Sequence, residues 1–190
     1  MKNKLFFIIG MRRSGTSILR TLISLHPEIE NIEFEPHELL FACESIHIPR
    51  YNKSQYHIDT INRFKNHYDK WYSAKISLNA GIESLRYRRL EEKFDKPYYV
   101  FIKRNCIDTF KSWYKIDNKP TGRGVVPFEM YEPWWKHINH SFYDFIKKNP
   151  ERGIIVEYEK LVKNADLELE VVWNMLNIKP IIGLNKYMIK

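Results

Sequence analysis

The chain has 190 residues, 44% of them hydrophobic, which favours a single domain over residues 1–190 built around one core. The formal net charge of +8 indicates an anionic partner, but no run of like charges marks a nucleic-acid-binding tail, so we expect no nucleic acid as a partner. No apolar segment approaches the roughly 20 residues needed to span a bilayer, and two widely separated cysteines without metal-ligand spacing fit a reducing compartment; we therefore expect a cytoplasmic protein without a transmembrane segment.

The first predicted elements are a strand, a loop and a helix. Residues 4–9 form a continuous apolar run that ends at Gly10, the pattern of a strand buried on both faces of a parallel sheet. From Ser17 onward, apolar residues recur at helical spacing. The elements predicted next are a short strand over residues 32–34, a helical insertion over residues 51–72 and a helix over residues 82–94.

The second half of the chain repeats the alternation of strand and helix. Residues 98–102 predict a buried strand, and the prolines and glycines of residues 119–133 predict a mobile loop. The other elements expected here are helices over residues 108–114, 134–148 and 167–176 and a strand over residues 153–156. Alternating strands and helices predict an α/β fold, a three-layer α/β/α domain whose central parallel sheet binds its ligand at the carboxyl ends of the strands.

The loop after the first strand, GMRRSGTS, has glycines at Walker-type spacing. It departs from the phosphate-binding loop of nucleotide triphosphatases because Thr16 stands where those proteins carry lysine. Backbone N–H groups at the start of a helix still bind an anion, and Ser14, Thr16 and Ser17 can add hydroxyl donors. The alternative is that the two glycines only permit a tight turn while Arg12 and Arg13 are solvated.

A second strand-to-helix junction, in FIKRNCIDTFKSWY, supplies another candidate anion site. Arg104 ends the strand, and Ser112 follows eight residues later, about two turns into the helix. A planar guanidinium and a hydroxyl at this spacing can converge on one anion. Two anion sites in one small domain predict a ligand with two phosphate groups.

These motifs resemble the sulfotransferases that use 3′-phosphoadenosine 5′-phosphosulfate (PAPS). RSGTS after a strand, a helix ending in LHPEI, and RNxxDxxxSxY after a later strand carry the resemblance, with the heparan and protein-tyrosine types closest in motif. The resemblance implies the P-loop-like fold of that family, with the 3′-phosphate on Arg104 and Ser112. VEYEKL is similar to a late strand followed by Tyr-Glu, which implies that Tyr158 lies near the adenine. The residues implied for the 5′-phosphosulfate come from the first loop: Arg12, Arg13, Ser14, Gly15, Thr16 and Ser17.

Sulfuryl transfer needs positive charge around the moving group, an acceptor in line with it and a base for the acceptor's proton. IEFEPHELLF is similar to the Glu-x-His stretch of heparan-type enzymes, which implies Glu35 as the base with His37 beside it. The spacing in protein-tyrosine sulfotransferases suits Glu33 nearly as well, and a solvated acidic turn is the alternative to both. Lys75 matches a family lysine that acts on the bridging or sulfuryl oxygens, although an ordinary surface lysine is the competing interpretation.

The implied function is transfer of a sulfuryl group from PAPS to a hydroxyl, or less favourably an amine, of an acceptor such as a glycan, with no metal. Arg13 stands where the family often has lysine, so it would stabilise the leaving phosphate electrostatically and not as a proton donor. Two alternatives stay open: a P-loop nucleotide kinase or phosphotransferase, which Thr16 disfavours, and a non-catalytic module that binds PAPS or its product. The second alternative draws support from the absence of the family's Gly-rich basic C-terminal segment. The acceptor and the oligomeric state are not predicted.

Overall fold

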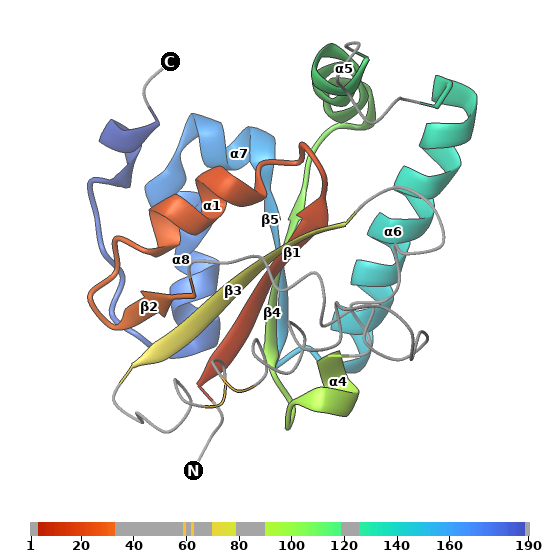
Figure 1. The fold of residues 1–190 in the computed structure, drawn as a ribbon. Coiled ribbons are helices and arrows are strands. Elements are labelled where there is room, and N and C mark those ends of the chain that lie inside the picture. Colours follow the sequence, from red (N-terminus) through yellow and green to blue (C-terminus); the bar gives the residue numbers. More distant parts are fainter. Residues whose placement is uncertain are drawn as a thin grey trace.

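The computed structural model describes residues 4–32, 59, 62, 70–78, 90–118 and 126–188, and it has the predicted three-layer α/β/α architecture (Figure 1). A sheet of five parallel strands forms the middle layer, in the spatial order β2-β3-β1-β4-β5. Its strands are β1 (Leu5–Met11), β2 (Ile29–Asn31), β3 (Trp71–Leu78), β4 (Tyr98–Lys103) and β5 (Gly153–Glu157). The α/β fold class predicted from the sequence is therefore confirmed.

Helices cover both faces of the sheet. On one face lie α1 (Thr16–Ile23), α7 (Tyr158–Lys163) and α8 (Ala165–Leu176), and on the other lie α4 (Leu90–Lys93) and α6 (Phe128–Lys148) (Figure 1). The remaining helices are α5 (Cys106–Asp117), above the carboxyl ends of the strands, and the short 3-10 helix η2 (Leu184–Tyr187). Among the described residues, no helix has the length and apolar character to cross a membrane.

The central strand β1 explains why two cores form. All of its residues are buried, and successive side chains of a strand point to opposite faces. Phe7 and Ile9 therefore pack in the core under α6, whereas Phe6 and Ile8 pack in the core under α1 and α8. A strand buried on both faces is positioned accurately, and so is the loop that leaves its carboxyl end.

Three predicted boundaries are wrong. The second strand is Ile29–Asn31, in which Ile29 pairs with Trp71 of β3, and Ile32 lies just beyond its end. Residues 33 and 34 of the predicted strand lie outside the described residues. Residues 71 and 72 of the expected helical insertion lie in β3, although the described Asp59 and Asn62 of that insertion are helical. The remainder of the insertion lies outside the described residues.

The third correction concerns the expected loop over residues 119–133. Helix α6 already begins at Phe128 and contains Pro133, while residues 119–125 lie outside the described part of the chain. Burial of Tyr131, only 2% exposed, anchors this first stretch of helix in the core. Its packing outweighs the backbone hydrogen bond that proline cannot make.

Candidate active site

The loop that joins β1 to α1 occupies the carboxyl end of the central strand. Gly15 precedes α1 with φ of 103°, a left-handed conformation that favours glycine, and a Cβ there would lie 2.8 Å from a Tyr158 ring carbon. Arg13 is also left-handed, with φ of 71°. No side chain caps the start of α1, because Gly15 has none to offer. The first N–H groups of this helix are therefore available to an anion.

The side chain of Ser14 folds back over the end of β1. A Cβ at Gly10 would collide with the Ser14 hydroxyl and would lie 2.9 Å from the Ile102 carbonyl oxygen, so only glycine fits there. Ser14 is 2% exposed, and its hydroxyl has no hydrogen-bond partner among the residues that the structure describes. An unsatisfied buried polar atom costs roughly 1–3 kcal/mol, so a ligand that bonds to this hydroxyl would be bound favourably.

The two predicted anion sites come together in space. Arg13 donates from Nε to the Ser112 hydroxyl at 3.3 Å, and Arg104 donates from a terminal guanidinium nitrogen to the Arg13 carbonyl oxygen at 3.2 Å. The Arg104 guanidinium also lies over the Tyr158 ring, 4.3 Å from its centroid. We call Arg13, Arg104, Ser112 and Tyr158 the donor cluster.

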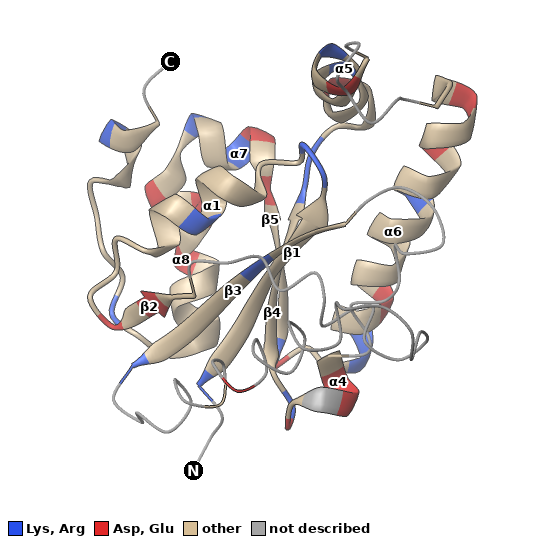
Figure 2. Cartoon of the chain, viewed as in Figure 1, with Lys and Arg blue, Asp and Glu red and all other residues tan. Residues whose placement is uncertain are grey.

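The donor cluster carries positive charge that no described carboxylate pairs with. Within the described ranges, no carboxylate forms an ion pair with Arg13 or Arg104, and the buried Nε of Arg104 has no hydrogen-bond partner. Figure 2 shows the basic residues of the β1–α1 loop beside those at the end of β4. The two guanidinium groups repel each other because both are positive. An anion bound between them would be attracted to both, and this attraction would offset the repulsion.

Arg12 has a different environment from Arg13. Its guanidinium forms an ion pair with Asp117, at 2.9 Å between the nearest atoms, and Asp117 is only 3% exposed at the end of α5. The Arg12 backbone N–H donates to the Leu78 carbonyl oxygen at 2.8 Å. Arg12 therefore connects the first loop with both β3 and α5.

Strand β3 brings a lysine to the same loop. Lys75 is 6% exposed, and its ammonium group donates to the Ser17 hydroxyl at 3.0 Å, so it is not an ordinary surface lysine. The hydroxyls of Thr16 and Ser77 lie 3.1 Å apart in a hydrogen bond. A lysine from a neighbouring strand thus supplies positive charge near the position where a Walker-type loop carries its own.

Three residues of this region were not found by sequence reasoning: Ser77, Asp117 and Glu159. A Glu159 carboxylate oxygen accepts a hydrogen bond from the Asn105 backbone N–H at 2.8 Å, which connects the first turn of α7 to the start of α5. For Glu159, the Tyr-Glu pair of VEYEKL was a sequence feature that could have identified it as part of the site. No sequence feature identifies Asp117 or Ser77, because their roles depend on contacts between distant segments.

The predicted base lies outside the described residues, as do its neighbours Glu33 and His37. The placement of Glu35 near the loop therefore stays a prediction. Within the described segments, no group of three or more His, Cys, Asp or Glu side chains could hold a metal ion.

Comparisons with known proteins identify the family and the fold. The family model described as sulfotransferase domain matches residues 3–186. The sulfotransferase domain from the curacin biosynthetic pathway is 17% identical, with 97% of this chain and 77% of that chain covered and a TM-score of 0.68. Mouse sulfotransferase SULT7A1, complexed with PAP, is 15% identical, with 100% and 66% covered and a TM-score of 0.66.

A protein of another name has a similar structure. The tunicamycin resistance protein of Deinococcus radiodurans is 11% identical, with 96% of this chain and 100% of that chain covered and a TM-score of 0.61. Identities this low show likeness of fold alone. No curated protein sequence matches this chain.

Proposed function

The chain belongs to the sulfotransferase domain family, and we propose that it transfers a sulfuryl group from PAPS to a hydroxyl of an acceptor, with an amine as the less favoured acceptor group. The observation that carries the PAPS assignment is the donor cluster, in which two strand-to-helix junctions present guanidinium groups that pair with no carboxylate of the described residues. Such a cluster suits a nucleotide with anionic groups at both its 3′ and 5′ positions.

The residues present fit this donor. The uncapped start of α1 and Arg13 suit the 5′-phosphosulfate, while Arg104 and Ser112 suit the 3′-phosphate. Tyr158 packs against Gly15 and Arg104, and these contacts support its proposed position near the adenine. The bound PAP of the mouse structure, adenosine 3′,5′-bisphosphate, is the product that PAPS leaves after sulfuryl transfer, and it supports the proposal by analogy.

The proposed reaction is a displacement at sulfur. The acceptor oxygen forms a bond to sulfur, the bond from sulfur to the bridging phosphate oxygen breaks, and adenosine 3′,5′-bisphosphate leaves. Arg13 stabilises the charge that develops on the leaving phosphate, and Lys75 adds positive charge beside Ser17. Glu35 takes the acceptor's proton, with His37 orienting it, and Glu33 is the alternative base.

A phosphoryl transferase is the second candidate, because the fold is also found outside the sulfotransferases. Thr16 in place of the loop lysine argues against it, since its hydroxyl bonds to Ser77 and gives no positive charge. The buried Lys75 restores a positive charge at the loop, so charge alone does not exclude phosphoryl transfer. Ligand preference separates the two candidates.

The test compares adenosine 3′,5′-bisphosphate with ATP and magnesium by thermal unfolding of the whole chain. A ligand that binds only the folded state stabilises it by RT ln(1 + [L]/Kd), about 2.7 kcal/mol at a hundredfold excess over Kd. We expect the bisphosphate to raise the melting temperature and ATP to raise it much less. Equal stabilisation by both would contradict the donor assignment and favour the phosphoryl transferase.

A further inference from the structure

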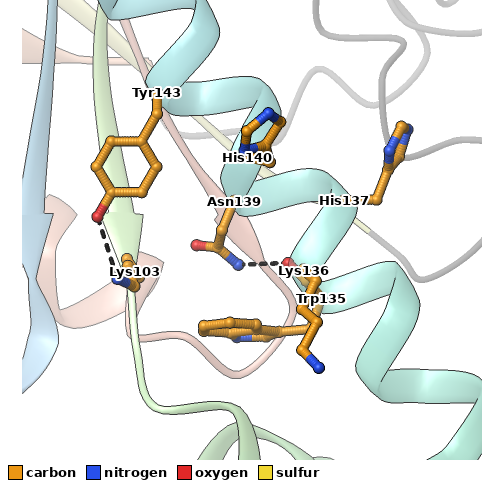
Figure 3. Close-up of a pocket in the computed structure, with 7 residues that line it drawn as sticks. All are labelled: Lys103, Trp135, Lys136, His137, Asn139, His140 and Tyr143. Carbon is orange, nitrogen blue, oxygen red and sulfur yellow. Dashed lines mark hydrogen bonds between the residues drawn. The ribbon is translucent and has the colours of Figure 1, made fainter.

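An open cavity of about 440 Å³ lies between the end of β4 and one side of α6 (Figure 3). Its lining includes Lys103 from β4 and Trp135, Asn139 and Tyr143 from α6. None of these residues belongs to the donor cluster. The cavity is nevertheless adjacent to it, because Lys103 directly precedes Arg104 and the Trp135 indole N–H donates to the Arg104 carbonyl oxygen at 3.1 Å.

Lys103 brings a positive charge into this cavity. Its ammonium group donates to the Tyr143 hydroxyl at 3.1 Å, and in the described part of the chain no carboxylate lies within 4.0 Å of it. The other lining lysine, Lys136, differs because it forms an ion pair with Glu132 at 3.0 Å. An ammonium group can donate three hydrogen bonds, so Lys103 retains donors for an anion.

Aromatic rings form the walls around this ammonium group. It lies 5.3 Å from the centroid of the Tyr143 ring and 6.0 Å from that of Trp135. Hydrogen bonds hold the wall in place, since Asn139 is 5% exposed and donates to the Trp135 carbonyl oxygen at 2.7 Å, while the Trp135 indole is bound to Arg104. Figure 3 shows Lys103, Tyr143, Asn139 and Trp135 grouped on one side of α6, with His137 turned away from Lys103.

We propose that this cavity binds the anionic end of the acceptor. A carboxylate or sulfate group pairs with Lys103, and the ring that carries it, a sugar or an aryl ring, packs on Trp135 and Tyr143. The identification of this ligand as the acceptor rests on the proposed function. The binding of a ring that carries an anionic group rests only on the cavity. A neutral ring would keep the aromatic contact and lose the charge pair.

The test uses two matched pairs of small probes that differ in charge. Methyl glucuronide is compared with methyl glucoside for the sugar source, and benzoate with benzamide for the aryl source. Binding is followed through the indole N–H signal of Trp135 in two-dimensional NMR spectra, first with adenosine 3′,5′-bisphosphate in excess and then without it. We expect the charged member of at least one pair to bind about tenfold more tightly than its neutral partner, as one charge-assisted hydrogen bond provides.

Variants of Lys103 test whether the tighter binding of the charged probes depends on this cavity. Lys103→Met keeps the length of the side chain and should abolish the tenfold preference, Lys103→Arg should retain it, and Lys147→Met, an exposed change on α6 outside the cavity, should leave it intact. The proposal is overturned if neither charged probe binds, if charged and neutral probes bind alike, or if Lys103→Met keeps the preference. Failure of the bisphosphate to bind would instead count against the proposed function, because the probes are also titrated in its absence.

Discussion

At the scale of single residues, Arg104 has the most informative surroundings. Its guanidinium stacks on Tyr158, donates to the Arg13 carbonyl oxygen and leaves a buried Nε without a partner among the described residues. Stacking and a backbone hydrogen bond hold the group in one orientation without neutralising its charge. A guanidinium held in this way is prepared to bind an anion.

Replacing Arg104 should therefore change ligand preference more than folding. We expect Arg104→Ala to weaken binding of adenosine 3′,5′-bisphosphate about 10- to 100-fold, the effect of one to two charge-assisted hydrogen bonds. Binding of adenosine 5′-monophosphate, which lacks the 3′-phosphate, should change little. Calorimetry with both nucleotides measures the difference, and Arg104→Lys is the control that keeps the charge without the planar fork. An equal loss for both nucleotides would show that Arg104 acts on the fold or on another group.

Cys106, at the start of α5, should be an unreactive thiol. Burial raises its pKa to about 11, and the nearby Glu132 carboxylate contributes to the rise. At pH 8 only about one molecule in a thousand then carries the reactive thiolate, compared with about a quarter for a free cysteine. In a Cys43→Ser variant, alkylation by iodoacetamide should be roughly 100-fold slower than for glutathione. Comparable rates would refute the environment described for Cys106.

At the scale of elements, the ion pair of Arg12 and Asp117 connects the β1–α1 loop to α5. Arg13 and Ser112 come from these same two elements and meet in the donor cluster. The pair therefore acts as a positioning contact for the donor cluster. It also gives the carboxylate of Asp117, buried at the end of α5, a partner of opposite charge.

Breaking this pair should loosen the donor cluster. Asp117→Asn keeps the shape and removes the charge, and we expect a stability loss of about 1–3 kcal/mol, less than a fully buried pair would cost because Arg12 is partly exposed. Binding of adenosine 3′,5′-bisphosphate should weaken several-fold. A double-mutant cycle with Arg12→Met tests the pair itself, and we expect a coupling energy above about 0.5 kcal/mol. If the effects of the two changes on stability simply add, Arg12 and Asp117 do not interact energetically, and the positioning role is refuted.

The strands that the sequence predicted are the ones with unbroken apolar runs. β1, β4 and β5 were found in this way, whereas β3 was missed because Ser73, Lys75 and Ser77 interrupt its pattern. Lys75 and Ser77 are the residues that bond to Ser17 and Thr16 of the loop. The alternation of these polar residues with apolar ones is itself a strand pattern, and the search for unbroken apolar runs passed over it. What local pattern could not show is that the polar side chains are buried, since burial of a polar residue on a strand depends on partners far away in the sequence.

At the scale of the whole molecule, sheet order places the site. β1 lies between β3 and β4. The strands that follow it in sequence, β2 and β3, lie on one side of β1, and the later strands β4 and β5 lie on its other side. Ligands of open α/β sheets bind outside the carboxyl ends of the strands at such a switch point. The loops after β1, β4 and β5 and the side chains of β3 meet there, which is why residues predicted separately form one cluster.

The central claim, that this cluster holds the donor of a sulfuryl group, is tested most directly by transfer of radiolabelled sulfate from PAPS to a panel of glycan, phenol and peptide acceptors. We expect the wild-type chain to label at least one acceptor. Glu35→Gln should lower the rate about 10²- to 10⁴-fold, the usual contribution of a general base, while nucleotide binding stays near the wild-type value. A collapse in Glu33→Gln with Glu35→Gln intact would move the base by two residues. No transfer by the wild type to any acceptor, despite tight binding of adenosine 3′,5′-bisphosphate, would contradict the account and identify a binding module.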